Sequence, residues 1–80
     1  MDKSILLERL QNIMRNVFND KELKISESSS AKDVEEWDSL TNIELIVAIE
    51  KEFDFRFTSL EVISLKNVGD LISKIEEKIS

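Results

Sequence analysis

Apolar residues recur with helical spacing in three long stretches of this chain, and this pattern predicts an all-α fold. We predict one helix over about residues 4–18, a second over residues 39–53, and a last one that begins at Asn67 as N-cap. Residues 53–57 alternate aromatic and polar side chains, but no second segment of similar strength exists to pair with them. Because a lone strand is unstable, we interpret this segment as an extended connector.

A short helix and a long loop complete the expected architecture. Thr58 and Glu61 have the spacing of a capping box, which would open a short helix ending near Ser64. Residues 19–37 contain four serines and few apolar residues, as is typical of a loop. The expected anchors of this loop in the core are Leu23, Ile25 and Val34. The expected core-facing stripes are Leu6, Leu7, Leu10, Ile13, Met14, Val17 and Phe18 in the first helix, Leu45, Ile46, Ile49 and Phe53, with Ala48 at the margin, in the second, and Val68, Leu71, Ile72, Ile75 and Ile79 in the last.

Length and composition suit one small domain over residues 1–80, and the hydrophobic content of 41% is too high for a disordered chain. The chain has no cysteine, so aliphatic packing rather than disulfides must stabilise it. No apolar run approaches the roughly 20 residues that a membrane-spanning helix needs, and the N-terminus lacks a signal-peptide pattern. We therefore expect a cytoplasmic protein without a membrane span.

The negative charge is concentrated in one segment. The net charge is −6, and six of the 17 acidic residues lie between residues 33 and 50, where there is no lysine or arginine. The other 11 acids balance the 11 basic residues, so the whole imbalance lies in this segment. Phosphate binding needs a concentrated basic face, which argues against a nucleic-acid partner. Proteins with basic patches are favoured as partners, although an acidic run can also be a merely solvated surface.

The helix predicted at residues 39–53 carries a second apolar stripe. Asp38 is a good N-cap for this helix, because its carboxylate can accept backbone N–H groups and its charge suits the helix dipole. Leu40, Ile43 and Val47 share a face that differs from the core-facing one. We expect this second stripe to stay partly exposed; the alternative is a central helix that is buried all round.

Ser39 directly follows this cap, and the chain has no histidine or cysteine to make it a catalytic nucleophile. Glycine-rich phosphate loops and metal-ligand spacings are also missing from the sequence. We therefore predict no catalytic residue, no metal site and no enzymatic activity. A helix N-terminus, with its unsatisfied N–H groups and positive dipole, would instead suit a phosphodiester attached to Ser39. The alternative is that Ser39 serves only as a second capping hydroxyl.

Three motifs stand out: EWDSLTNIEL at residues 36–45, IEKEF at residues 49–53 and VGDL at residues 68–71. With the predicted helix lengths and the long first loop, they resemble the acyl carrier protein family over nearly the whole chain. The resemblance implies a four-helix bundle of the acyl-carrier type, in which three helices are longer and the third is short.

The resemblance also implies a cofactor and partners. In that family the serine of Asp-Ser-Leu receives 4′-phosphopantetheine from coenzyme A through a Mg-dependent phosphopantetheinyl transferase, and Ser39 matches that serine. The thiol of the arm carries acyl groups as thioesters between enzymes. Asp38 matches the acid that caps the helix and assists transferase recognition. The implied partners are an acyl- or aminoacyl-activating enzyme and a synthase or acyltransferase with a basic docking patch. The positions through which such carriers meet their partners correspond to Leu40, Ile43, Glu44 and Val47.

The chain departs from fatty-acid carriers at three positions. Trp37 replaces the small residue that usually precedes Asp-Ser-Leu, and Asn42 and Lys51 stand where those carriers tend to be acidic. These departures favour a dedicated carrier in a specialised pathway, such as polyketide, nonribosomal peptide, surface-polysaccharide or lipid modification. We also expect the chain to be a monomer. One alternative is an aminoacyl carrier for D-alanyl or peptidyl groups. A second is an unmodified helical domain that docks a partner through its exposed apolar stripe.

Overall fold

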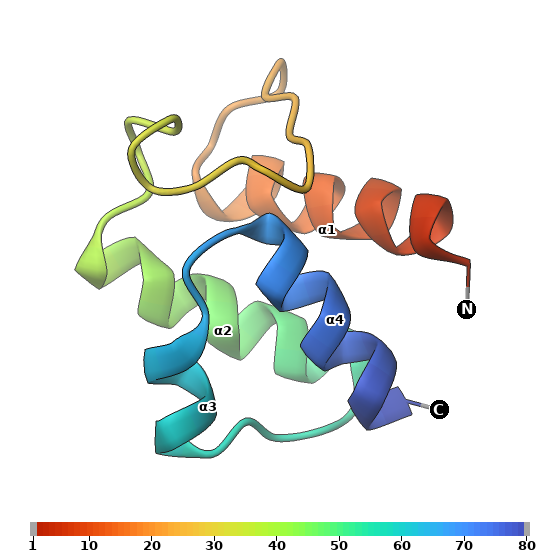
Figure 1. The fold of residues 1–80 in the computed structure, drawn as a ribbon. Helices are drawn as coiled ribbons and strands as arrows, with labels where there is room; N and C mark the ends of the chain where they lie inside the picture. The colour runs from red at the N-terminus through yellow and green to blue at the C-terminus, as the bar shows by residue number, and fades with distance from the viewer. Residues whose placement is uncertain (1, 80) are drawn as a thin grey trace.

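The computed structural model describes residues 2–79, and this part of the chain forms four α-helices joined by loops. They are α1 (Lys3–Val17), α2 (Ser39–Phe53), the short α3 (Ser59–Ser64) and α4 (Val68–Ile79). Figure 1 shows α4 lying below α1 and in front of α2, with α3 at the lower left. The predicted all-α architecture of three longer helices and one short helix is confirmed.

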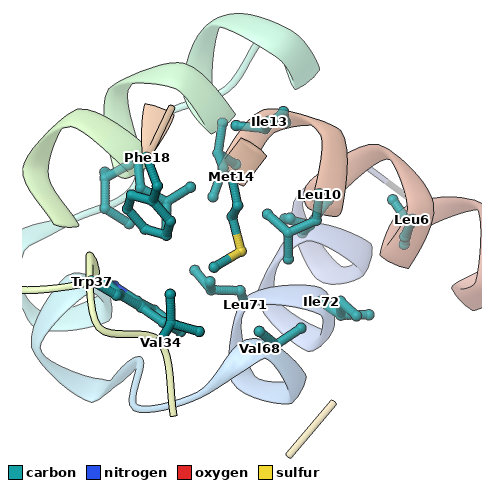
Figure 2. Packing of buried hydrophobic residues seen from close by; sticks show 14 residues of the cluster. Leu6, Leu10, Ile13, Met14, Phe18, Val34, Trp37, Val68, Leu71 and Ile72 are labelled. Carbon is teal, nitrogen blue, oxygen red and sulfur yellow. The ribbon is translucent and has the colours of Figure 1, made fainter. Parts of the chain in front are cut away.

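The core is an aliphatic cluster in which α1, α2 and α4 meet (Figure 2). Figure 2 shows the Met14 side chain reaching from α1 toward Leu71 of α4. One aromatic pair closes the cluster where the long loop crosses it: the rings of Phe18 and Trp37 lie 6.3 Å apart between centroids. The buried members are Leu6, Leu10, Ile13, Met14, Phe18, Val34, Trp37, Leu45, Ile46, Ile49, Val68, Leu71, Ile72 and Ile75.

Of the two apolar stripes of α2, one is buried and the other is exposed, as predicted. Leu45, Ile46 and Ile49 are buried, while Ala48 and Phe53 are half-buried against the cluster. The second stripe faces outward: Leu40 is 75% exposed, Ile43 63% and Val47 43%. The alternative of a helix that is buried all round is therefore wrong, because α1 and α4 cover only one side of α2.

The long first loop is held by the N-terminus of α4. The first N–H groups of a helix have no partner inside it, and here Val68 N donates to Ser29 O at 2.8 Å and Gly69 N to Glu27 O at 2.7 Å. A Cβ atom at Gly69 would lie 3.0 Å from the Glu27 carbonyl oxygen, so a larger residue here would have to push the loop backbone away by a few tenths of an ångström. The predicted loop anchors are also confirmed, since Val34 is buried and Leu23 and Ile25 are half-buried.

The end of α2 and the connector that follows it place three partly buried aromatic rings, Phe53, Phe55 and Phe57, against the core, as predicted. Asp54 ends α2 in the left-handed conformation, with a φ of 57°. The rings of Phe55 and Phe57 then meet edge to face, with centroids 4.9 Å apart. Glu50 of α2 fixes the far end of the connector, because its carboxylate accepts the N–H of Phe57 at 2.8 Å.

A charged contact joins α3 to α4. Thr58 and Glu61 form the predicted capping box, with Thr58 N donating to Glu61 Oε1 at 2.8 Å and Glu61 N to Thr58 Oγ1 at 3.2 Å. The same carboxylate lies 2.7 Å from Lys78 Nζ and 3.8 Å from Lys74 Nζ of α4. The hydrogen bond from Lys78, followed by that from the Thr58 N–H, lowers the pKa of Glu61 from 4.5 to about 2.

This shift predicts how stability depends on pH. Because the folded-state pKa of Glu61 lies below the unfolded one, its contribution is complete above about pH 4.5 and is lost as the pH falls toward about 2. Glu61→Gln keeps a capping-box side chain but removes the charge. We expect its free energy of unfolding to lie below that of the wild type at pH 7 and the gap to close between about pH 4.5 and about 2. Urea titrations at a series of pH values measure this gap.

The matched control is Glu35→Gln, which removes an exposed carboxylate that has no ion pair among residues 2–79. A pH-independent gap for Glu61→Gln would contradict the prediction, as would an equal pH-dependent gap for the control.

Candidate functional site

Asp38 caps α2 in the way that the sequence predicts. Its Oδ1 accepts the backbone N–H groups of Leu40 and Thr41, both at 2.9 Å. The Thr41 hydroxyl in turn accepts the N–H of Asp38 at 2.9 Å, which completes a capping box. These hydrogen bonds, that from the Thr41 N–H above all, lower the pKa of Asp38. Asp38 therefore stays ionised and keeps the first turn of α2 fixed near neutral pH.

Ser39 is the first residue of α2 and lies exposed beside this cap. Among residues 2–79, no side-chain hydrogen bond involves the Ser39 hydroxyl, whereas Asp38 and Thr41 do all the capping. The alternative role of Ser39 as a second capping hydroxyl thus has no hydrogen bond to support it. The cap fixes the backbone on both sides of an oxygen that remains accessible to another molecule.

One expectation from the sequence is met only in part. We expected unsatisfied N–H groups at the start of α2 to suit a phosphodiester on Ser39. The Asp38 carboxylate already takes the N–H groups of Leu40 and Thr41, and the Asp38 carbonyl takes that of Asn42 at 2.9 Å. Among residues 2–79 the N–H of Ser39 itself donates to no acceptor, so one N–H group at the start of α2 stays unsatisfied. The helix dipole remains favourable to a negative charge there.

A recess of about 180 Å³ opens beside Ser39. It lies where the end of the long loop, the start of α2 and the α3–α4 connector come together, and a group attached to Ser39 could begin there without displacing a core side chain. Its wall is held by one hydrogen bond, in which Trp37 Nε1 donates to Asn42 Oδ1 at 2.9 Å. The lining residues are Ala31, Trp37, Asp38, Ser39, Asn42, Leu65 and Lys66.

Exposed apolar residues follow Ser39 along α2 and also occur on α3. Leu40, Ile43, Glu44 and Val47, which we call the α2 face, are all exposed. Two residues of α3 that the sequence did not single out as a surface are also exposed, Leu60 at 80% and Ile63 at 74%. The six-residue length of α3 could have indicated this exposure, because so short a helix can bury only one of its sides.

The described part of the chain offers little else for chemistry. Within residues 2–79, histidine, cysteine, aspartate and glutamate side chains form no group of three that could hold a metal ion. Over the same residues no helix has both the length and the apolar composition to cross a bilayer.

Comparison with known proteins decides the family. The sequence model of a family described as a phosphopantetheine attachment site matches residues 8–75. The acyl carrier protein of Thermosynechococcus vestitus is 35% identical to this chain, over 100% of this chain and 99% of that protein. The chain belongs to the acyl carrier protein family.

Further relatives agree with this assignment. The acyl carrier protein of Caulobacter vibrioides is 35% identical over 94% of this chain and 96% of its own length. The solution NMR structure of the holo acyl carrier protein of Geobacter metallireducens superimposes with a TM-score of 0.86. That pair is 38% identical, and the match covers 91% of this chain and 84% of the other. As an acyl carrier protein, the chain is a non-catalytic carrier whose cofactor is phosphopantetheine, and a phosphopantetheinyl transferase attaches it.

Proposed function

We propose that Ser39 Oγ is the attachment point of 4′-phosphopantetheine and that the chain delivers acyl groups to partner enzymes from this position. When bound, the arm supplies the thiol that this cysteine-free chain lacks and holds acyl groups on it as thioesters. The observation that carries the proposal is the exposed Ser39 hydroxyl, which follows the cap but takes no part in it. The role of Asp38 is to hold the backbone of Ser39 in one conformation and to present it to the transferase.

The α2 face is the proposed docking surface for partner enzymes. Leu40, Ile43 and Val47 offer apolar contacts next to Ser39, and Glu44 lies among them. Glu44 lies on this face and the exposed Asp38 at its start, and residues 33–50 contain six acids and no base, so a synthase or acyltransferase with a basic patch is the partner that complements it. Exposed apolar residues inside an acidic rim favour brief encounters with a defined orientation, as a carrier that visits several enzymes requires.

We further propose that the pathway is a specialised one, such as polyketide, nonribosomal peptide, polysaccharide or lipid modification. The support is the pair formed by Trp37 and Asn42, since the indole is buried and its N–H needs the side-chain oxygen of Asn42. Trp37 and Asn42, which stand where fatty-acid carriers tend to have a small and an acidic residue, are thus linked to each other by a hydrogen bond. Lys51 adds a positive charge to the end of α2. A partner that fits this surface would differ from one that fits a uniformly acidic helix.

The remaining parts of the proposal concern the whole chain. Residues 1–80 form a single domain, since α1, α2 and α4 share one core, and it acts as a monomer. A cytoplasmic location suits it, because coenzyme A and the activating enzyme must both reach Ser39. The alternative is an aminoacyl carrier loaded with D-alanyl or peptidyl groups. Such a carrier differs from the proposed acyl carrier only in its cargo.

Intact-mass measurement tests this function. Incubation of the wild-type chain with coenzyme A, Mg²⁺ and a broad-specificity phosphopantetheinyl transferase should add the mass of one phosphopantetheine group. The mass of protein isolated from its native host should then identify the cargo as acyl or aminoacyl. A wild-type chain that gains no mass, yet still binds a partner through the α2 face, would instead be an unmodified docking domain.

A further inference from the structure

A single basic residue lines the recess beside Ser39. Lys66 belongs to the connector between α3 and α4, far from Ser39 in the sequence, and Figure 1 shows this connector passing the first half of α2. The lining residues include one acid, Asp38, and one base, Lys66. The Lys66 side chain is exposed and forms no ion pair among residues 2–79. Its charge is therefore available to another group at the recess.

The backbone that carries Lys66 is held on two sides. Its N–H donates to Asp70 Oδ2 at 3.0 Å, and Asn67 forms an isolated antiparallel bridge with Ser30 of the long loop. Asn67 Oδ1 also accepts the N–H of Asp70 at 2.8 Å, which caps α4. Since these bonds fix the position of the main chain, the flexible stem of Lys66 can swing within a limited region beside Ser39.

A phosphodiester on Ser39 would need a positive partner of this kind. It would add a negative charge to the segment of residues 33–50, which has six acids and no base. The N–H groups of Leu40, Thr41 and Asn42 already donate to Asp38, so only the neutral N–H of Ser39 itself is left for the phosphate, and it does not balance the added charge. A lysine ammonium is a compact charge with three donors, well suited to phosphate oxygens.

We propose that the Lys66 ammonium is the counter-ion of the phosphodiester on Ser39, and that it directs the root of the arm across the recess toward the α3–α4 connector. This inference rests on the proposed attachment at Ser39. Lys66 acts as a positioning residue: it contacts neither the thiol nor the cargo. By drawing the phosphate to one side of α2, it leaves the α2 face open for a partner enzyme.

The test compares thermal midpoints before and after loading. Wild type, Lys66→Gln and Lys51→Gln are each prepared without the arm and fully loaded, as checked by intact mass. At physiological salt, loading should stabilise Lys66→Gln less than it stabilises the wild type, with a difference in the midpoint change of roughly 1–8 °C for one exposed ion pair. At 1 M NaCl, where the Debye length is about 3 Å, this difference should largely vanish.

Lys51→Gln is the matched control, because it removes the same charge from α2 about 18 Å along the helix from Ser39. That distance exceeds the Debye length of about 8 Å at physiological salt. Loading should therefore change the thermal midpoint of Lys51→Gln as much as it changes that of the wild type. An equal loading change in Lys66→Gln and wild type would overturn the inference.

A second measurement needs no variant. In the loaded wild type, NMR should show nuclear Overhauser contacts between the Lys66 side-chain methylenes and the first methylene of the arm. Their absence would overturn the inference. Because this measurement uses only the wild type, it holds even if Lys66→Gln fails to fold or to load. Failure of the wild type itself to gain the arm would be a different result, because it would reject the attachment at Ser39.

Discussion

Ser39→Ala should abolish loading completely, since it removes the oxygen that would form the phosphodiester. The fold should survive, because Asp38 and Thr41 make the cap without help from the Ser39 hydroxyl. We expect no mass gain after incubation with coenzyme A and a transferase, and an unfolding midpoint close to that of the wild type. Alanine is also a good helix residue at an exposed position.

The chain supplies a matched control in Ser59. It is the first residue of α3, follows the capping residue Thr58, and is exposed like Ser39. Ser59→Ala should therefore load as fully as the wild type. A phosphopantetheine mass gain that survives Ser39→Ala but disappears in Ser59→Ala would place the attachment on α3 and contradict the proposal.

Leu45→Ala should destabilise the protein by about 2–5 kcal/mol, because it leaves a cavity in a tightly packed interior. Leu45 is fully buried where α2 meets the rest of the core. Such a loss is a large share of the roughly 5–15 kcal/mol that stabilises a typical domain. Urea denaturation of unloaded protein gives this free energy, and the slope of the transition should stay unchanged if only stability is affected.

Leu40→Ala is the same substitution on the same helix at a side chain that is 75% exposed. It should change the free energy of unfolding by no more than about 0.5 kcal/mol. If the α2 face is the docking surface, Leu40→Ala should instead slow the transfer of cargo to a partner enzyme. Equal destabilisation by the two substitutions would mean that the inner and outer sides of α2 are misassigned.

Sequence alone determined the elements that depend on local patterns. Helical spacing of apolar residues located all three longer helices, since one face of each must be buried. The capping residues Asp38 and Thr58 marked the starts of α2 and α3 because their hydrogen bonds reach only two or three residues along the chain. Ser39 could be singled out as the proposed attachment point because it directly follows this cap and lies in the motif at residues 36–45.

Tertiary structure decided what depends on residues far apart in the chain. Trp37 lies in a loop, where no periodicity signals burial, and only the fold brings its ring to Phe18. The ion pair between Glu61 and Lys78 requires α3 to lie against α4. Lys66 reaches the recess beside Ser39 because the α3–α4 connector is tied to the long loop. Contacts of this kind arise from packing between elements, which neither spacing nor composition can specify.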